Sequence, residues 1–167
     1  MRSLTPILGR ALALVALAVM ASSTAAYAQY ETYMELLRED VKTEKVAIIT
    51  EAMQFTDDQS SVFWPIYREY DLELSKLIDQ RIALIKDFAA SYTTMTDDKA
   101  NELAGRSFKI RENRVKLLKK YYGKVEKQLG AAMAVRWAQT ERVINTLIDL
   151  QVQSQLPLMP KGGSGKN

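Results

Sequence analysis

Two aspartate doublets, Asp57-Asp58 and Asp97-Asp98, are the residues whose type and spacing come closest to a reactive site. If the fold brought the doublets together, their carboxylates could bind Ca²⁺ or act as an acid–base pair. Each doublet directly follows a threonine, however, and this pattern starts a helix, where carboxylates interact favourably with the positive end of the dipole. We therefore expect two helix starts, with no metal site and no cofactor.

The composition of the chain argues against an enzyme. Among 167 residues there are 0 His and 0 Cys, which removes the commonest general base, the thiol nucleophile and the soft metal ligands. The sequence also has no glycine-rich phosphate loop and no dinucleotide-binding fingerprint. We expect a protein that binds other molecules without catalysis.

The first residues have the layout of a signal peptide. Residues 1–28 combine Arg2 and Arg10, an apolar run over 11–21, and Ala26-Tyr27-Ala28 at the cleavage position. We expect export to the periplasm with cleavage after Ala28, one all-α domain over residues 29–156, and a disordered tail over residues 157–167. Without the basic leader the chain is close to neutral, so nucleic acid is not an expected partner.

Helical periodicity fills the first half of the expected domain. Residues 31–54 should form one helix, with Ile48 and Ala52 on its apolar face and the Lys45 stem covering a gap. A second helix should run from Asp57 to about Ala90, capped by Thr56 and Gln59, which can exchange hydrogen bonds in a capping box. Its apolar seam comprises Phe63, Tyr67, Tyr70, Leu74, Leu77, Leu84 and Phe88, interrupted by Arg81. Pro65 should kink this helix, or else the helix starts late.

A second cap, at Thr96 and Lys99, predicts a third helix. Its seam comprises Ala104, Phe108, Val115, Leu118, Tyr122, Val125 and Leu129, with Arg111 in one seam position. Gly130 should end this helix, and residues 131–155 should form a fourth. The pattern predicts an all-α fold of four helices around a long antiparallel hairpin, arranged as a bundle or a cradle. Because the coiled-coil-like seams exceed what a small monomer needs, we expect a homodimer whose register Arg81 and Arg111 help to set.

Two groups of residues are candidates for binding a client protein. Phe63 and Trp64, with Tyr67 one turn further on, are either core residues or part of an apolar surface. On the third helix, Lys116, Lys119 and Lys120 belong to a run rich in cations. That run is either a solvated face or an electropositive surface for acidic client segments or anionic membrane headgroups.

The segment Phe55-Thr56-Asp57-Asp58-Gln59, repeated more weakly as Met95-Thr96-Asp97-Asp98-Lys99, resembles the LTXXQ-motif family of periplasmic helical proteins (Spy/CpxP-like). Phe and Met stand in place of the leading Leu, and the second copy has Lys in place of Gln. The resemblance implies a cradle-shaped, all-α dimer that holds partly unfolded proteins without ATP or modulates the envelope-stress response. The alternative is a structural adaptor that docks a membrane-anchored protein such as a sensor.

Overall fold

The computed structural model describes residues 44–160, and these residues fall into two compact units. One unit covers residues 1–47, of which only the helical residues 44–47 are described; the other covers residues 48–167. The expected signal peptide, the start of the first expected helix and residues 161–167 of the expected tail lie outside the described residues. The second unit contains all three long helices of the described chain.

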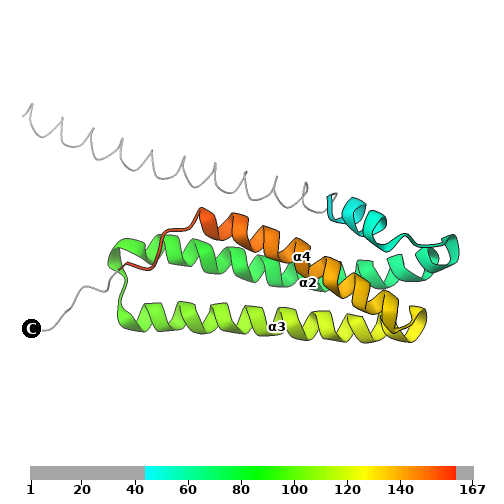
Figure 1. The fold of residues 1–167 in the computed structure, drawn as a ribbon. Coiled ribbons are helices and arrows are strands. Elements are labelled where there is room, and N and C mark those ends of the chain that lie inside the picture. The colour runs from blue at the N-terminus through cyan, green and yellow to red at the C-terminus, as the bar shows by residue number, and fades with distance from the viewer. Residues whose placement is uncertain (1–43, 161–167) are drawn as a thin grey trace, which may run out of the picture. The chain divides into compact units, whose positions relative to one another are not determined.

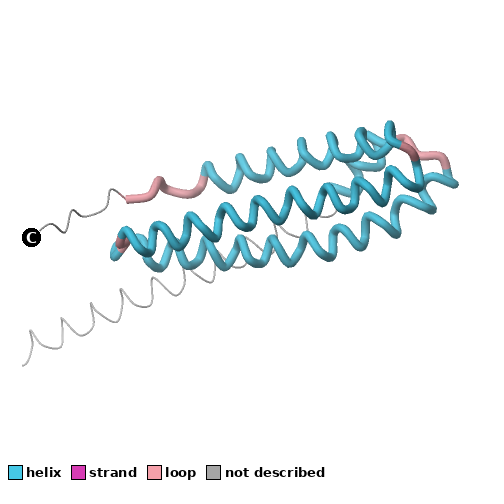
Figure 2. Tube along the Cα trace, turned by 90° about the horizontal axis from the view of Figure 1, so that it is seen from below, coloured by secondary structure: helices cyan, strands magenta, loops and turns pink. Residues whose placement is uncertain are grey.

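The described chain is all-α, as predicted, with four α-helices, one short 3-10 helix and no strand among residues 44–160. A first helix ends at residue 53, and α2 (Asp57–Ser91), η1 (Tyr92–Thr94), α3 (Asp97–Leu129) and α4 (Ala131–Ser154) come after it. The helices α2 and α3 form the predicted antiparallel hairpin, and α4 turns back along α3, so that it runs in the same direction as α2 (Figures 1 and 2). No helix among the described residues has an apolar stretch long enough to cross a membrane.

The helix α2 begins where its cap predicts. Thr56 N–H donates to the Gln59 side-chain oxygen at 3.1 Å, and Gln59 N–H donates to the Thr56 hydroxyl oxygen at 3.3 Å. This reciprocal pair satisfies two backbone donors that a helix start otherwise leaves without partners. The helix then continues through Pro65 to Ser91, so the alternative of a late start is wrong. Because Pro65 has no N–H, the Ser61 carbonyl receives no bond from it.

Much of the buried face of the first helix and of α3 lies one residue away from the predicted seams, although Val125 of α3 is buried as predicted. In the first helix Ile49 and Met53 are buried, whereas Ile48 is exposed. In α3 the buried side chains are Leu103, Ile110, Leu117, Tyr121 and Val125. The predicted seam residues Phe108 and Val115 instead point to solvent. Both helices carry apolar residues at adjacent positions, so two stripes satisfy the same spacing and packing against neighbours selects between them.

An aromatic core occupies the end of the bundle where α2 starts, α3 ends and α4 starts. The Trp137 ring is fully buried and meets the Phe63 ring edge-on at 6.0 Å and the Tyr70 ring edge-on at 5.2 Å. Tyr70 in turn contacts Tyr121 of α3, with ring centroids 5.6 Å apart. Aromatic pairs at these separations add stability beyond the burial of their area, so this cluster joins all three long helices.

Ion pairs join the helices towards the other end of the bundle. Asp149 of α4 accepts hydrogen bonds from Arg114 of α3 at 2.9 Å and from Arg81 of α2 at 2.5 Å. Asp87 of α2 binds Lys99 at 3.0 Å and also binds Arg106 of α3. The charge of Arg81 is therefore met within the chain, and its presence in the seam is no longer an argument for a dimer.

Candidate functional site

The residues of the two caps serve the helix starts. Thr96 accepts a hydrogen bond from the Lys99 N–H at 3.2 Å, as Thr56 does from Gln59. The Lys99 side chain does not return to its cap but binds Asp87 and Glu102. The first motif is thus a complete capping box and the second is half of one.

Two of the three aromatic client-binding candidates are core residues. Phe63 is 0% exposed and Tyr67 is 4% exposed, so neither offers a surface to a client in this structure. The hypothesis that they form part of a surface is corrected, because the rings of Phe55, Trp64 and Trp137 surround Phe63. Trp64 is different, since it packs on the edge of the aromatic core and is only partly buried.

The three lysine candidates are exposed, but two of them are paired. Lys116 binds Glu112 one turn earlier at 2.5 Å, and Lys120 binds Glu73 of α2 at 2.7 Å. Lys119 forms no ion pair with the described residues. Lys116 and Lys120 thus lie on a solvated face where nearby carboxylates offset part of their charge.

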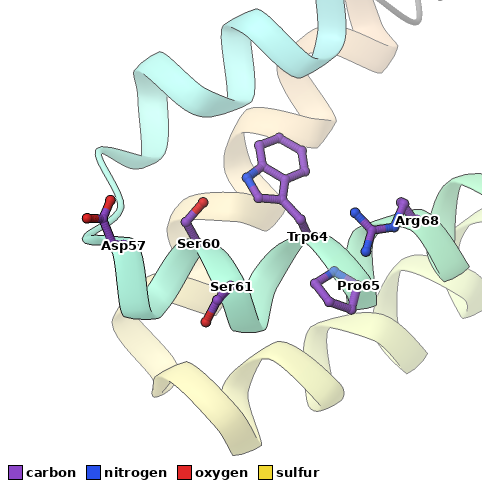
Figure 3. Close-up of a pocket in the computed structure, with 6 residues that line it drawn as sticks. All are labelled: Asp57, Ser60, Ser61, Trp64, Pro65 and Arg68. Carbon is purple, nitrogen blue, oxygen red and sulfur yellow. The ribbon is translucent and has the colours of Figure 1, made fainter.

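The structure does not bring Trp64 and the lysine group together. Glu73, which holds Lys120, lies nine residues after Trp64, and at about 100° per residue the two side chains leave opposite sides of α2. Figure 3 shows the Trp64 side chain pointing away from α3. The fold therefore does not form a single client surface that combines Trp64 with Lys116, Lys119 and Lys120.

The basic bias of α3 has an explanation that the sequence reasoning missed. Many of the α3 cations face carboxylates on α2 and α4: Lys120 with Glu73, Lys124 with Glu69, Arg106 with Asp87, and Arg114 with Asp149. The signal was present, because α2 carries acidic residues at helical spacing. This acidic pattern predicts the ion pairs only when the alignment of α2 against α3 is known, since 47 residues separate Lys120 from Glu73.

One pocket stands at the start of α2, with a volume of about 380 Å³. Its lining residues all come from the first three turns of α2 and are drawn in Figure 3: Asp57, Ser60, Ser61, Trp64, Pro65 and Arg68. Spacings of three and four place Asp57, Ser61, Trp64 and Arg68 on one face of the helix.

The pocket combines groups of different chemistry. The Trp64 ring packs edge-on against Phe63 at 5.3 Å and Tyr67 at 5.5 Å, so its position is held by the core. Arg68 forms no ion pair with the described residues. The Ser61 carbonyl, which Pro65 leaves without a helical donor, adds an acceptor. This arrangement suits an apolar side chain attached to a backbone or carboxylate group.

The pocket has no arrangement for nucleophilic catalysis. The Ser61 hydroxyl donates to the Asp58 carbonyl at 2.7 Å, and no basic side chain contacts it within the described part of the chain. A serine nucleophile needs an adjacent base that accepts its proton. Among the described residues no group of three or more acidic side chains could hold a metal ion.

A buried carboxylate lies inside the aromatic core, apart from the pocket. The fully buried Glu141 of α4 accepts hydrogen bonds from the Tyr70 hydroxyl at 3.0 Å and from the Asn145 amide at 3.1 Å. Burial, and then the Glu141 charge, raise the pKa of Tyr70 well above its ordinary value, so Tyr70 remains a neutral donor. The cluster orients α4 on α2 and has no access from solvent through Tyr70 or Glu141.

Comparisons with known proteins identify no relative, since no family model, curated protein or solved structure matches the chain. The resemblance to the LTXXQ-motif family stays a prediction that rests on the two cap segments.

Proposed function

We propose that this chain is an exported binding protein that holds partly unfolded proteins in the periplasm without ATP and without catalysis. Trp64 carries the proposal: it is an aromatic side chain fixed by the core on one side and open to a pocket on the other. Such a preorganised aromatic surface binds apolar client segments with little loss of side-chain entropy.

The neighbours of Trp64 support a peptide as the ligand. Unfolded chains present apolar side chains next to free backbone amides and carboxylates. Arg68 can bind a carboxylate, and the carbonyl of Ser61 can accept a backbone N–H. The capping box at Thr56 fixes the start of the helix that carries all of these groups.

The resemblance to the LTXXQ-motif family adds to this proposal. Within that family, the motif precedes helices of periplasmic proteins that hold clients or modulate envelope stress. We propose the same broad role here, together with export directed by residues 1–28 and assembly as a homodimer.

An adaptor role is the second candidate, and one observation favours it. Val143, Leu147 and Leu150 lie on one side of α4 and are 60–67% exposed. Exposed apolar residues at steps of four and three provide a face for another helix. A membrane-anchored partner could dock there without using the Trp64 pocket.

Client holding can be tested with an aggregation-prone dehydrogenase diluted from guanidinium chloride. Light scattering should fall when the protein is present, and Arg68→Ala should weaken this protection several-fold. Arg68 is exposed and makes no ion pair with the described residues, so its replacement leaves the fold intact. Arg136→Ala removes an exposed cation from α4 that likewise forms no ion pair with the described residues, and it is the matched control.

Trp64→Ala and Trp64→Phe separate binding from stability. The alanine variant should lose most of its protection, while the phenylalanine variant keeps a ring on the core and should retain part of it. Holding should be measured well below the melting temperature of each variant. Full protection by Arg68→Ala and by folded Trp64→Ala would rule out this pocket as the client site.

A further inference from the structure

The outer side of α3 carries two of the most exposed apolar residues in the described chain. Phe108 is 67% exposed and Val115 is 69% exposed. They are seven residues apart, which places them on one line along the helix, two turns from each other. No described residue packs over them, whereas the inner side of α3 buries Ile110 and Leu117.

Cations without internal partners flank this line. Arg111, Lys119 and Lys127 are exposed and make no ion pair with the described residues, although the other cations nearby are paired. Together with Phe108 and Val115 these three cations define the α3 outer face, which extends over roughly 28 Å at 1.5 Å per residue.

The α3 outer face keeps a positive charge after its carboxylates are counted. Glu112 is shared by Lys109 at 3.7 Å and Lys116 at 2.5 Å, so it is more than neutralised. Glu126 is the other exposed carboxylate on this side of the helix. Five other cations of α3 bind carboxylates of α2 or α4: Lys99, Arg106, Arg114, Lys120 and Lys124.

We propose that the α3 outer face docks on an anionic lipid surface. A helix binds in the interface when apolar side chains reach the acyl boundary while long cationic side chains extend back to the phosphates. Phe108 and Val115 supply the first contact, and Arg111, Lys119 and Lys127 supply the second. This role is independent of the Trp64 pocket, because all residues that line that pocket belong to α2.

The mixture of side chains favours lipid over other anionic partners. Nucleic acid would use the cations, but an exposed valine between them would gain nothing from phosphates or from stacking. An acidic peptide needs a groove or a sheet edge to order it, whereas Phe108 and Val115 project from the outer side of a single helix. A lipid surface contacts the whole line at once.

Vesicle sedimentation tests the proposal with the full chain. Vesicles of equal phosphatidylglycerol and phosphatidylcholine should bind the protein, phosphatidylcholine vesicles should bind it much more weakly, and 0.5 M salt should reduce the difference. The combined variant Arg111→Gln, Lys119→Gln, Lys127→Gln should weaken the binding to anionic vesicles about hundredfold, at about fivefold per cation. Phe108→Ala with Val115→Ala should weaken it about tenfold.

Matched controls remove the same groups from other helices. Lys76→Gln, Arg136→Gln and Arg142→Gln replace three exposed cations that have no ion pair with the described residues. Val62→Ala with Leu72→Ala replaces two exposed apolar residues of α2. All variants share the same residues before Glu44, so any lipid contact through that segment is the same in each. The controls should bind as the unchanged chain does.

Three results would overturn the proposal. Equal binding to both kinds of vesicle would show that charge plays no part. An equal loss in the test and control variants would show that the α3 outer face is not special. Unchanged lipid binding by the Phe108 and Val115 variant, with a change in its sedimentation coefficient, would assign the face to a second copy of the chain.

Discussion

Thr56 contributes to stability through one local geometry, because its hydroxyl accepts the Gln59 N–H and its own N–H reaches the Gln59 side chain. Removing the hydroxyl leaves one helix donor without its partner. We expect Thr56→Ala to lower the free energy of unfolding by about 1 kcal/mol, measured by guanidinium chloride denaturation. Thr93→Ala, at an exposed threonine whose side chain makes no hydrogen bond with the described residues, should change it by less than about 0.5 kcal/mol. If Thr56→Ala were as stable as Thr93→Ala, the cap would have no structural role.

Asp149 should make stability depend on pH in the acid range. Partial burial by itself raises the pKa of Asp149, but the hydrogen bonds and charges of Arg114 and Arg81 outweigh burial and hold that pKa below its ordinary value of 3.8. A carboxyl with a lowered pKa in the folded state stabilises the fold above its unfolded pKa. That contribution is lost as the pH falls through the lower, folded value.

Asp149→Asn should therefore be less stable than the unchanged chain at pH 7, and the gap should close as the pH falls below 3.8. Urea unfolding monitored by circular dichroism from pH 7 to pH 2 measures this gap. Glu51→Gln, at an exposed glutamate away from any helix start that forms no ion pair with the described residues, is the control and should differ little from the unchanged chain at every pH. A constant difference between Asp149→Asn and the unchanged chain at all pH values would disprove the assignment.

At the scale of the helices, alanine substitutions at two glycines distinguish the effect of backbone conformation from the effect of packing. Gly130 connects α3 to α4 with φ 86° and ψ 161°, a conformation that side-chain-bearing residues rarely adopt. Gly123 lies inside α3, and a Cβ added at either glycine would meet nothing within 4 Å. The two positions therefore differ in backbone conformation and not in available space.

Gly130→Ala should lower the free energy of unfolding by about 1–3 kcal/mol, whereas Gly123→Ala should raise it by about 0.5–1 kcal/mol. Guanidinium chloride denaturation of both variants under one condition gives the comparison. A stabilising Gly130→Ala would mean that the link between α3 and α4 adopts another conformation in solution.

The helix starts could be predicted from the sequence because the signals are local. Thr56 with Gln59, Thr96, and Gly130 each act within one turn, and the structure places helix boundaries at all of them. The buried side of α3 could not be predicted, since Leu117 and Leu118 are both apolar and adjacent. Which of them faces inward depends on α2 and α4, and the same holds for the first helix.

The candidate site was only partly predictable for the same reason. The sequence indicates Trp64 as an aromatic candidate next to Phe63, but its half-buried position depends on the core that Phe63 and Trp137 complete. Arg68 was not identified, because a single arginine on a helix surface carries no signal until the pocket around it is seen. The lysines were identified correctly as exposed, but their carboxylate partners on α2 were not.

At the scale of the whole molecule, an exposed apolar stripe on α4 bears on the oligomeric state. The α4 stripe of Val143, Leu147 and Leu150 is the kind of exposed apolar surface that pairs helices between subunits. We expect a homodimer by sedimentation equilibrium, and we expect Leu147→Asp to shift it towards monomer. Leu72→Asp on α2, at a residue 65% exposed, is the control. A monomer at high micromolar concentration would leave the stripe to a different protein, as in the adaptor alternative.

The two tryptophans give this protein a pair of optical reporters. Trp137 is 0% exposed in the core, while Trp64 is half-buried beside the pocket, and the chain contains 2 Trp in all. Trp64→Phe therefore leaves a single indole whose blue emission changes only when the core opens. Trp137→Phe leaves an indole with redder emission that responds to whatever enters the pocket. Fluorescence of the two variants can thus separate loss of the fold from occupation of the pocket in a single titration.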